Sequence, residues 1–255
     1  MSELSQISAR TKKIALLIVF TALYIVFRFI PYSVLIGGGG FLSLSDFLAP
    51  IFGIILGPYL GGLSVVLGNF AALGLGRPSI FLGLDFLPDL VATMSVGFLV
   101  RRRWAPVALL NADLLIVFFL NPLTSFFVTI PGTTVTIPFA WMHIVAFAVL
   151  LSPLGRKASQ WVTAPKQTKQ IAIGLTVLAF IGTMMQHVTG NILFEFVYGQ
   201  IGNPPLIPAS AWPAEWALVV LAYPVERLVL IISAVLMGTP LIWILNKSPI
   251  LRPRE

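Results

Sequence analysis

The sequence predicts an all-α, polytopic bundle of about six to eight transmembrane helices, forming one integral membrane domain over residues 1–255. Hydrophobic residues make up 58% of the chain and charged residues only 10%, whereas soluble domains carry roughly 25% charge. The mean hydropathy is +0.97. Uncharged runs such as Ile14–Phe27 and Leu228–Leu236 do not alternate between polar and apolar residues, as the strands of a membrane barrel would.

Charge-free segments give the expected spans in chain order. The first, near 14–35, follows a basic N-terminus without an evident cleavage site, so we expect it to stay in the protein as a span. The other spans are expected near 46–57, 61–76, 84–100, 105–121, 136–154, 170–195 and 214–246.

The basic residues predict the orientation. If the N-terminus is cytoplasmic, the inward-facing segments hold 13 of the 16 lysines and arginines, and only Arg28, Arg77 and Arg227 lie elsewhere. Basic residues collect in cytoplasmic loops. We therefore expect a multi-pass protein of the cell membrane with both termini in the cytoplasm. The net charge of +7 then reflects topology and not nucleic-acid binding.

The segment 46–76 is too long for one ordinary span and short for two. Its middle, Gly57–Gly62, reads GPYLGG, and both proline and glycine disfavour a helix interior. A single span here would move the arginines at 101–103 to the outside. Charge parity therefore favours two short spans or a re-entrant hairpin that turns at Gly57–Gly62.

Small residues are spaced for close helix contact in the same segment. Gly53, Gly57 and Gly61 form overlapping G-x-x-x-G steps, a pattern that lets helix backbones approach in lipid. This face either packs inside the bundle or docks another membrane subunit.

Polar residues gather in the outer halves of the expected spans. His187, Asn191 and Glu195 recur at four-residue spacing, and such residues share one helix face. Arg28, Asp46, Asp85, Asp89, Glu226 and Arg227 lie at similar depth, and Asp113 is an exception near the middle of a span. Ionisable groups in a bilayer are costly and often functional, although those near helix ends can also reach the interface. Glu226 and Arg227 point about 100° apart on a helix, so we expect partners on other helices, with Glu226 near Arg28 or Arg227 near Asp89.

Catalytic motifs are absent from the sequence. It has no cysteine, no H-E-x-x-H zinc motif, no G-x-S-x-G nucleophile elbow and no phosphate-binding loop. Asp85 and Asp89 could form a carboxylate pair, but intramembrane proteases draw such pairs from two spans. We expect a protein that is not an enzyme, with no cofactor and no metal.

The loops expected outside differ from the basic ones. Four glycines at 37–40 follow the first span, and glycine makes a chain easy to bend. This loop is either a plain hinge or a mobile lid over an outward-facing site.

The N-terminal third resembles the substrate-binding S components of energy-coupling factor (ECF) transporters, which capture vitamins and related micronutrients. The matching residues are TALYIV at 21–26, LSDFLAP at 44–50, and GPYLGG at 57–62 followed by Gly68 and Asn69. Weaker matches are YPVERL at 223–228 and GTPL at 238–241. The resemblance implies a transmembrane coupling subunit and two ATPases as partners, and an outward-facing site covered by the loop after the first span.

Two features depart from this family. Six spans in a shorter chain are usual there, and residues 105–155 look like an insertion. The small-x-x-x-small pair of the first span is missing, because Ala15 and Ala22 are seven residues apart. Docking through Gly53, Gly57 and Gly61 is the alternative.

The combined interpretation is a substrate-capture subunit that binds a small solute from outside. The expected binding residues are His187, Asn191, Glu195, Glu226, Arg227, Asp89 and Arg28. His187 and Asn191 would hydrogen-bond the ligand, Glu195 would hold an amine or pair with an arginine, and the arginines would meet a carboxylate or phosphate. The alternatives are a self-sufficient, proton-coupled secondary transporter and an intramembrane enzyme.

Overall fold

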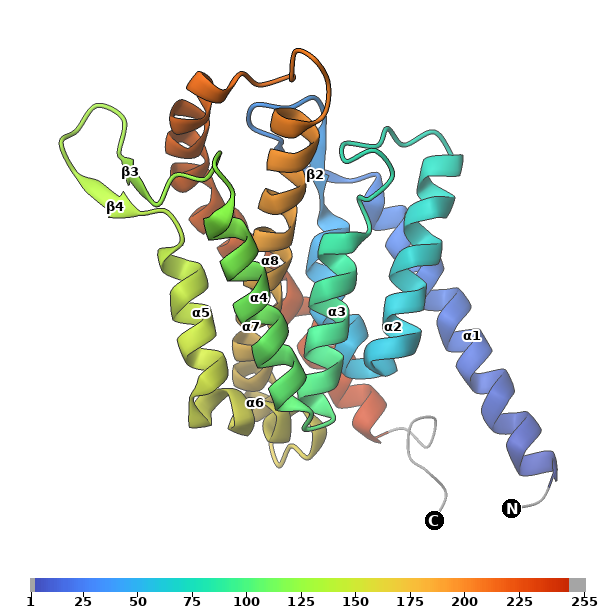
Figure 1. Cartoon of the computed structure of the whole chain (residues 1–255). Coiled ribbons are helices and arrows are strands. Elements are labelled where there is room, and N and C mark those ends of the chain that lie inside the picture. Colours follow the sequence, from blue (N-terminus) through green and yellow to red (C-terminus); the bar gives the residue numbers. More distant parts are fainter. Residues whose placement is uncertain (1–2, 248–255) are drawn as a thin grey trace.

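The structure is a computed structural model that describes residues 3–247, and these residues form an all-α bundle as predicted (Figure 1). The helices are α1 (Glu3–Arg28), α2 (Leu48–Gly74), α3 (Leu87–Val100), α4 (Trp104–Leu120), α5 (Trp141–Leu151), α6 (Pro153–Thr163), α7 (Thr168–Phe194) and α8 (Trp212–Lys247). Shorter turns are η1 (Leu44–Phe47), η2 (Glu195–Gln200) and η3 (Ala209–Ala211).

Within residues 3–247, three helical segments are long and apolar enough to cross a membrane, by length and composition. They are Leu44–Gly74, which is interrupted at Gly57, Thr168–Gln200 and Ala209–Lys247. In contrast, α3, α4 and α5 have 14, 17 and 11 residues, fewer than the roughly 20 that a span perpendicular to the bilayer needs.

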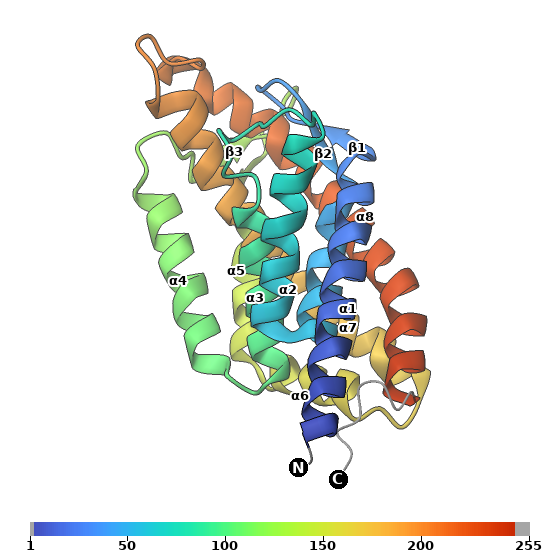
Figure 2. The same cartoon turned by 90° about the vertical axis from the view of Figure 1, so that its right-hand side faces the viewer.

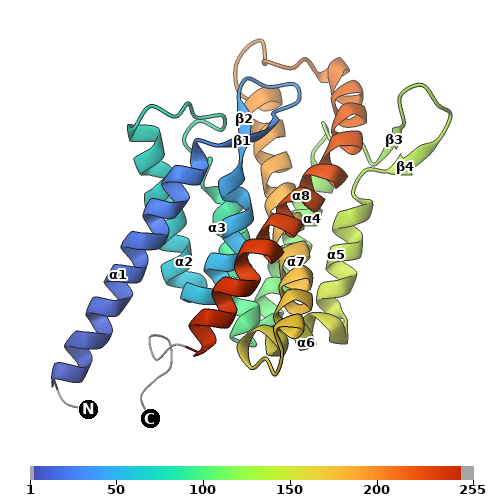
Figure 3. The ribbon, with the colours of Figure 1, turned by 180° about the vertical axis from the view of Figure 1, so that it is seen from behind.

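Helix α7 is the centre of the bundle. Its apolar window is 72% buried, whereas that of α8 is only 33% buried. Helices α3, α6 and α8 pack along α7, and α2 packs between α1 and α3. Figure 2 shows α4 on the outside of the bundle, and Figure 3 shows α8 crossing it obliquely from one end to the other.

The predicted turn inside the segment 46–76 is present. Gly57 has φ +77° and ψ −178°, which breaks the helix. Tyr24 of α1 packs against both Phe52 and Gly68, which would lie about 24 Å apart in a straight helix. The chain therefore reverses at Gly57, and the two arms of α2 lie side by side.

The structure corrects the docking prediction for Gly53, Gly57 and Gly61. All three are buried. A Cβ atom on Gly53 would collide with the backbone oxygen of Thr93 in α3, and one on Gly61 would lie 2.9 Å from the backbone oxygen of Phe52. The G-x-x-x-G spacing assumed one continuous helix. Because the chain reverses, the glycines instead bring the two arms and α3 into close contact.

Two short β-hairpins were not predicted. Strands β1 (Pro31–Val34) and β2 (Phe41–Ser43) pair across the glycine run, and β3 (Phe127–Thr129) pairs with β4 (Thr136–Pro138). The expected spans 14–35 and 136–154 are therefore too long, because each includes residues that form a hairpin strand. Pro31 explains the first difference, because a proline disfavours helical conformation in the residue before it.

The hairpins and the described chain ends lie at opposite ends of the bundle. Figure 1 shows both hairpins at one end, and the start of α1, the α3–α4 turn, helix α6 and the end of α8 at the other. The α2 turn belongs to the second group, because a Cβ atom on Gly57 would lie 2.5 Å from the Arg101 guanidinium. The expected outside and inside loops are thus separated in space.

Candidate functional site

A cavity lies beneath the first hairpin, at the hairpin end of the bundle. Its volume is about 90 Å³, enough for several waters or a small ligand. We call it the charged cavity, and we call residues 31–43 the lid, because the lid residues Val34, Leu35, Ile36, Phe41, Leu42 and Ser43 line it. The remaining walls come from α1, η1, the α2–α3 loop and helices α3, α7 and α8.

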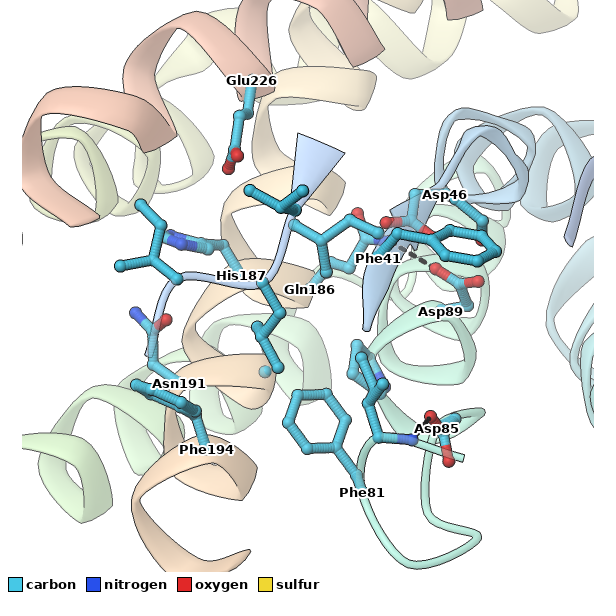
Figure 4. A pocket seen from close by; sticks show the side chains of 18 of the residues that line it. Phe41, Asp46, Phe81, Asp85, Asp89, Gln186, His187, Asn191, Phe194 and Glu226 are labelled. Atoms are coloured by element: carbon cyan, nitrogen blue, oxygen red, sulfur yellow. Dashed lines mark hydrogen bonds between the residues drawn. The ribbon is translucent and has the colours of Figure 1, made fainter. Parts of the chain in front are cut away.

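Six of the seven predicted binding residues line the charged cavity. They are Arg28, Asp89, His187, Asn191, Glu226 and Arg227. Figure 4 shows Asp46 and Asp89 across from His187 and Asn191, with Glu226 entering from α8. Glu195 does not line it.

Arg28 organises one wall of the cavity. Its guanidinium donates hydrogen bonds to the hydroxyl of Ser43 (3.1 Å) and the amide oxygen of Asn69 (2.9 Å). It also lies 3.9 Å from a carboxylate oxygen of Asp46 and 4.0 Å from one of Asp85. Arg28 is only 4% exposed. The guanidinium therefore joins the lid, η1, α2 and the α2–α3 loop. The expected Arg28–Glu226 pair is wrong, because Arg28 pairs with Asp46 and Asp85 and Glu226 pairs with Arg227, although both residues line the cavity.

Asp89 is buried and hydrogen-bonded on both carboxylate oxygens. The Tyr24 hydroxyl donates to one oxygen at 2.5 Å, and the amide of Gln186 donates to the other. These bonds connect α1, α3 and α7. Since the carboxylate has these partners, it is oriented before any ligand binds.

Arg77 closes the corner between α1 and the lid. Its guanidinium donates to the carbonyl of Arg28 at the end of α1 and, at 3.2 Å, to that of Phe41. It also lies 4.8 Å from the centre of the Phe41 ring. Burial, and then the nearby Arg28 charge, lower the pKa of Arg77. Arg77, which the charge pattern left unexplained, thus caps a helix C-terminus.

The lid is fastened to α8 by two neighbouring hydrogen bonds. The Ser33 hydroxyl donates to the carboxylate of Glu226, and the Arg227 guanidinium donates to the Tyr32 hydroxyl at 3.0 Å. Arg227 and Glu226 also pair with each other at 3.6 Å, which corrects the expected Arg227–Asp89 pair. Their long side chains bend back across the angle that separates them on the helix.

We expect Tyr32→Phe to loosen the lid without unfolding the bundle. The variant leaves the Arg227 guanidinium short of one acceptor, and hydrogen bonds to charged groups contribute about 1.5–3 kcal/mol. Burial raises the pKa of Tyr32, so its hydroxyl stays protonated near neutral pH. Amide hydrogen exchange across residues 31–43 should accelerate about tenfold or more.

Tyr59→Phe is the matched control, because Tyr59 is 62% exposed on α2. Equal exchange of the lid in the two variants would show that the Arg227–Tyr32 bond does not hold it.

His187 belongs to a stack of three rings. Its Nδ1 lies 3.0 Å from Nε2 of His143, and its ring lies 5.1 Å from that of His143 and 4.8 Å from that of Tyr223. The Tyr223 hydroxyl donates to the carbonyl of Phe139 at 2.9 Å. Because Nδ1 contacts His143, His187 can present only its Nε2 side to a ligand.

Glu195 lies away from the charged cavity. One carboxylate oxygen accepts a hydrogen bond from the Thr124 hydroxyl at 2.6 Å, and Thr124 follows α4. Eight residues at about 100° each carry Glu195 about 80° around the helix from His187, and α7 gives way to the π-helical η2 at this residue. The expected shared face therefore holds for His187 and Asn191 but not for Glu195.

Several cavity residues escaped sequence analysis. Gln186 and Arg77 were given no role, and Asp46 and Asp85 were left between an interfacial and a functional interpretation. The Asp85 carboxylate accepts hydrogen bonds from Ser79 and, at 2.8 Å, from the backbone N–H of Ile80. Gln186 directly precedes His187, but it is uncharged and belongs to no spacing pattern, so the sequence did not indicate that it lines the cavity.

Comparisons with known proteins assign neither a family nor a function. No family model matches the chain, and no solved structure gives a significant match. The chain is 23% identical over 194 residues to an uncharacterized protein of Methanocaldococcus jannaschii. The match covers 75% of this chain and 62% of that protein, so the chain spans less than two thirds of its relative's length.

Proposed function

We propose that this protein is the membrane-embedded substrate-capture subunit of an ECF-type micronutrient transporter. One observation carries the proposal: six of the seven predicted binding residues meet in a cavity beneath the loop that follows α1. The resemblance of the N-terminal third implies a site in this place, whereas the polar residues were predicted separately, from their depth in the membrane and their spacing along the helices.

The chemistry of the cavity favours a small zwitterionic or polar ligand. Its charged side chains are Arg28, Arg77, Arg227, Asp46, Asp85, Asp89 and Glu226, which are three cations and four anions. Most of them already have partners within the wall. The Nε2 side of His187 and the amide of Asn191 remain to hydrogen-bond the ligand, and Phe41, Phe81 and Phe194 offer apolar surface.

The proposal includes topology and partners. The basic end, which holds the start of α1 and the end of α8, would face the cytoplasm, and the charged cavity would open outward in a multi-pass protein of the cell membrane. A transmembrane coupling subunit and two ATPases would supply the energy, because this chain has no phosphate-binding loop.

Purification from native membranes through an affinity tag tests this function. Recovery of a coupling subunit and ATPases, together with ATP-dependent uptake by the reconstituted assembly, would support it. Uptake by the single chain in liposomes, driven by a proton gradient without ATP, would replace it with the secondary-transporter alternative.

We expect Asn191→Ala to weaken ligand binding and Glu195→Gln to leave it unchanged. Asn191 lines the charged cavity, and loss of a buried hydrogen bond to a ligand costs about 1–3 kcal/mol. Asn191→Ala should therefore lose the co-purifying ligand in native mass spectrometry. Glu195→Gln keeps the shape of a side chain that contacts Thr124, so it should retain the ligand. Retention by both variants would remove Asn191 from the site.

A further inference from the structure

A second cavity lies at the opposite end of the bundle, between the α3–α4 turn and α6. Its volume is about 300 Å³, more than that of the charged cavity. Leu99, Arg102 and Trp104 form one wall, and Gly155, Arg156 and Ser159 form another. We call it the basic cavity.

The basic cavity has a preformed wall. The indole N–H of Trp104 donates to the carbonyl of Leu150 at 2.6 Å, which orients the ring. The Arg156 guanidinium then lies 4.9 Å from the centre of that ring, within the range of a cation–π contact. The Trp104 ring thus holds the guanidinium of Arg156 at the cavity, although Arg156 is exposed.

Arg102 occupies a backbone position that favours glycine. Its φ is +59°, and the N–H groups of Arg102 and Arg103 bond to the carbonyls of Leu99 and Phe98. This is the Schellman arrangement, in which the left-handed residue is usually glycine. Backbone strain of this kind often accompanies a functional role of the side chain.

Among the side chains that the structure describes, residues 11–247, neither arginine forms an ion pair with a carboxylate. The ion pairs there join Arg28 to Asp46 and Asp85, and Arg227 to Glu226, all at the hairpin end. The segments beside the basic cavity contain Arg101, Arg103 and Lys157 in addition to the two lining arginines. Within this described part of the chain, no carboxylate compensates the positive charge of the cavity.

We propose that the basic cavity binds a phosphate group through Arg102 and Arg156. Guanidinium groups bind phosphate oxygens in a bidentate fashion, and Ser159, a buried residue that lines the same wall, adds a hydroxyl-bearing side chain. The phosphate can belong to an anionic phospholipid headgroup or to a soluble phosphate. Basic cavities between helices near the membrane surface suit headgroups, and Leu151 and Leu154 beside the cavity are 45% and 40% exposed, ready to contact acyl chains.

Native mass spectrometry of the delipidated full chain tests the proposal. Phosphatidylglycerol is titrated in neutral detergent, with phosphatidylcholine and inorganic phosphate as separate probes. Arg102→Gly and Arg156→Gln should each weaken phosphatidylglycerol binding about tenfold or more. Lys157→Gln and Arg103→Gln remove the same charge without lining the cavity, so they should change it less than about twofold.

Arg102→Gly also separates binding from folding. Glycine relieves the left-handed conformation, so the thermal unfolding midpoint should stay equal or rise while binding falls. Arginine-dependent binding of inorganic phosphate that displaces the lipid would assign the site to a soluble phosphate. The proposal would be overturned if Arg102→Gly and Arg156→Gln bound phosphatidylglycerol and inorganic phosphate as tightly as the wild type does. It would also be overturned if the wild type bound neither of them.

Discussion

Arg28→Met is expected to lower the free energy of unfolding by about 3–5 kcal/mol, because it removes one partner from a buried ion-pair cluster. The guanidinium is 4% exposed and lies within 4.0 Å of carboxylates of Asp46 and Asp85. Methionine fills a similar volume, but both carboxylates and the Asn69 amide oxygen lose the guanidinium as a partner. Unfolding in mixed micelles, followed by circular dichroism, measures the change.

Lys12→Met is the matched control, since Lys12 is exposed on the same helix. Arg28→Lys keeps the charge but cannot reproduce the two-pronged contact with Ser43 and Asn69, so its stability should lie between the other two. If Arg28→Met unfolds like Lys12→Met, the cluster does not stabilise this end of the bundle.

Gly57→Ala is expected to destabilise the protein by about 1–3 kcal/mol, the usual cost of a strained backbone conformation. At φ +77° and ψ −178° the residue lies in a region that is almost restricted to glycine. The added Cβ would also lie 2.5 Å from the Arg101 guanidinium, although that side chain can move. The thermal unfolding midpoint and the yield of folded protein measure the effect.

Gly74→Ala is the control with the opposite expected sign. Gly74 ends the same helix and has open space where a Cβ would be, so alanine should leave stability unchanged or raise it by up to about 1 kcal/mol. Gly97→Ala extends the test, because its Cβ would lie 2.5 Å from the backbone nitrogen of Pro58, which cannot move aside. Equal stability of Gly57→Ala and Gly74→Ala would contradict the reversal.

The depth and spacing of polar residues predicted much of the cavity but not its internal pairing. His187 and Asn191 were found because i,i+4 residues share a helix face. The Tyr24–Asp89 and Arg28–Asn69 contacts join residues 65 and 41 positions apart, and no local pattern encodes such distances. The prediction for Glu195 was wrong for two reasons. Residues eight positions apart on an α-helix no longer share one face, and α7 becomes π-helical at Glu195.

Composition by itself determined that this protein is built of apolar helices, and charge parity indicated the turn between two arms of 46–76. Both follow from local physics, because hydrocarbon excludes charge and every backbone polar group there needs an internal partner. Only the tertiary structure decided that Gly53 and Gly61 pack internally against α3 and the other arm, and that Ser33 and Tyr32 bind Glu226 and Arg227. Those contacts depend on how distant helices cross, and residue type alone does not determine that geometry.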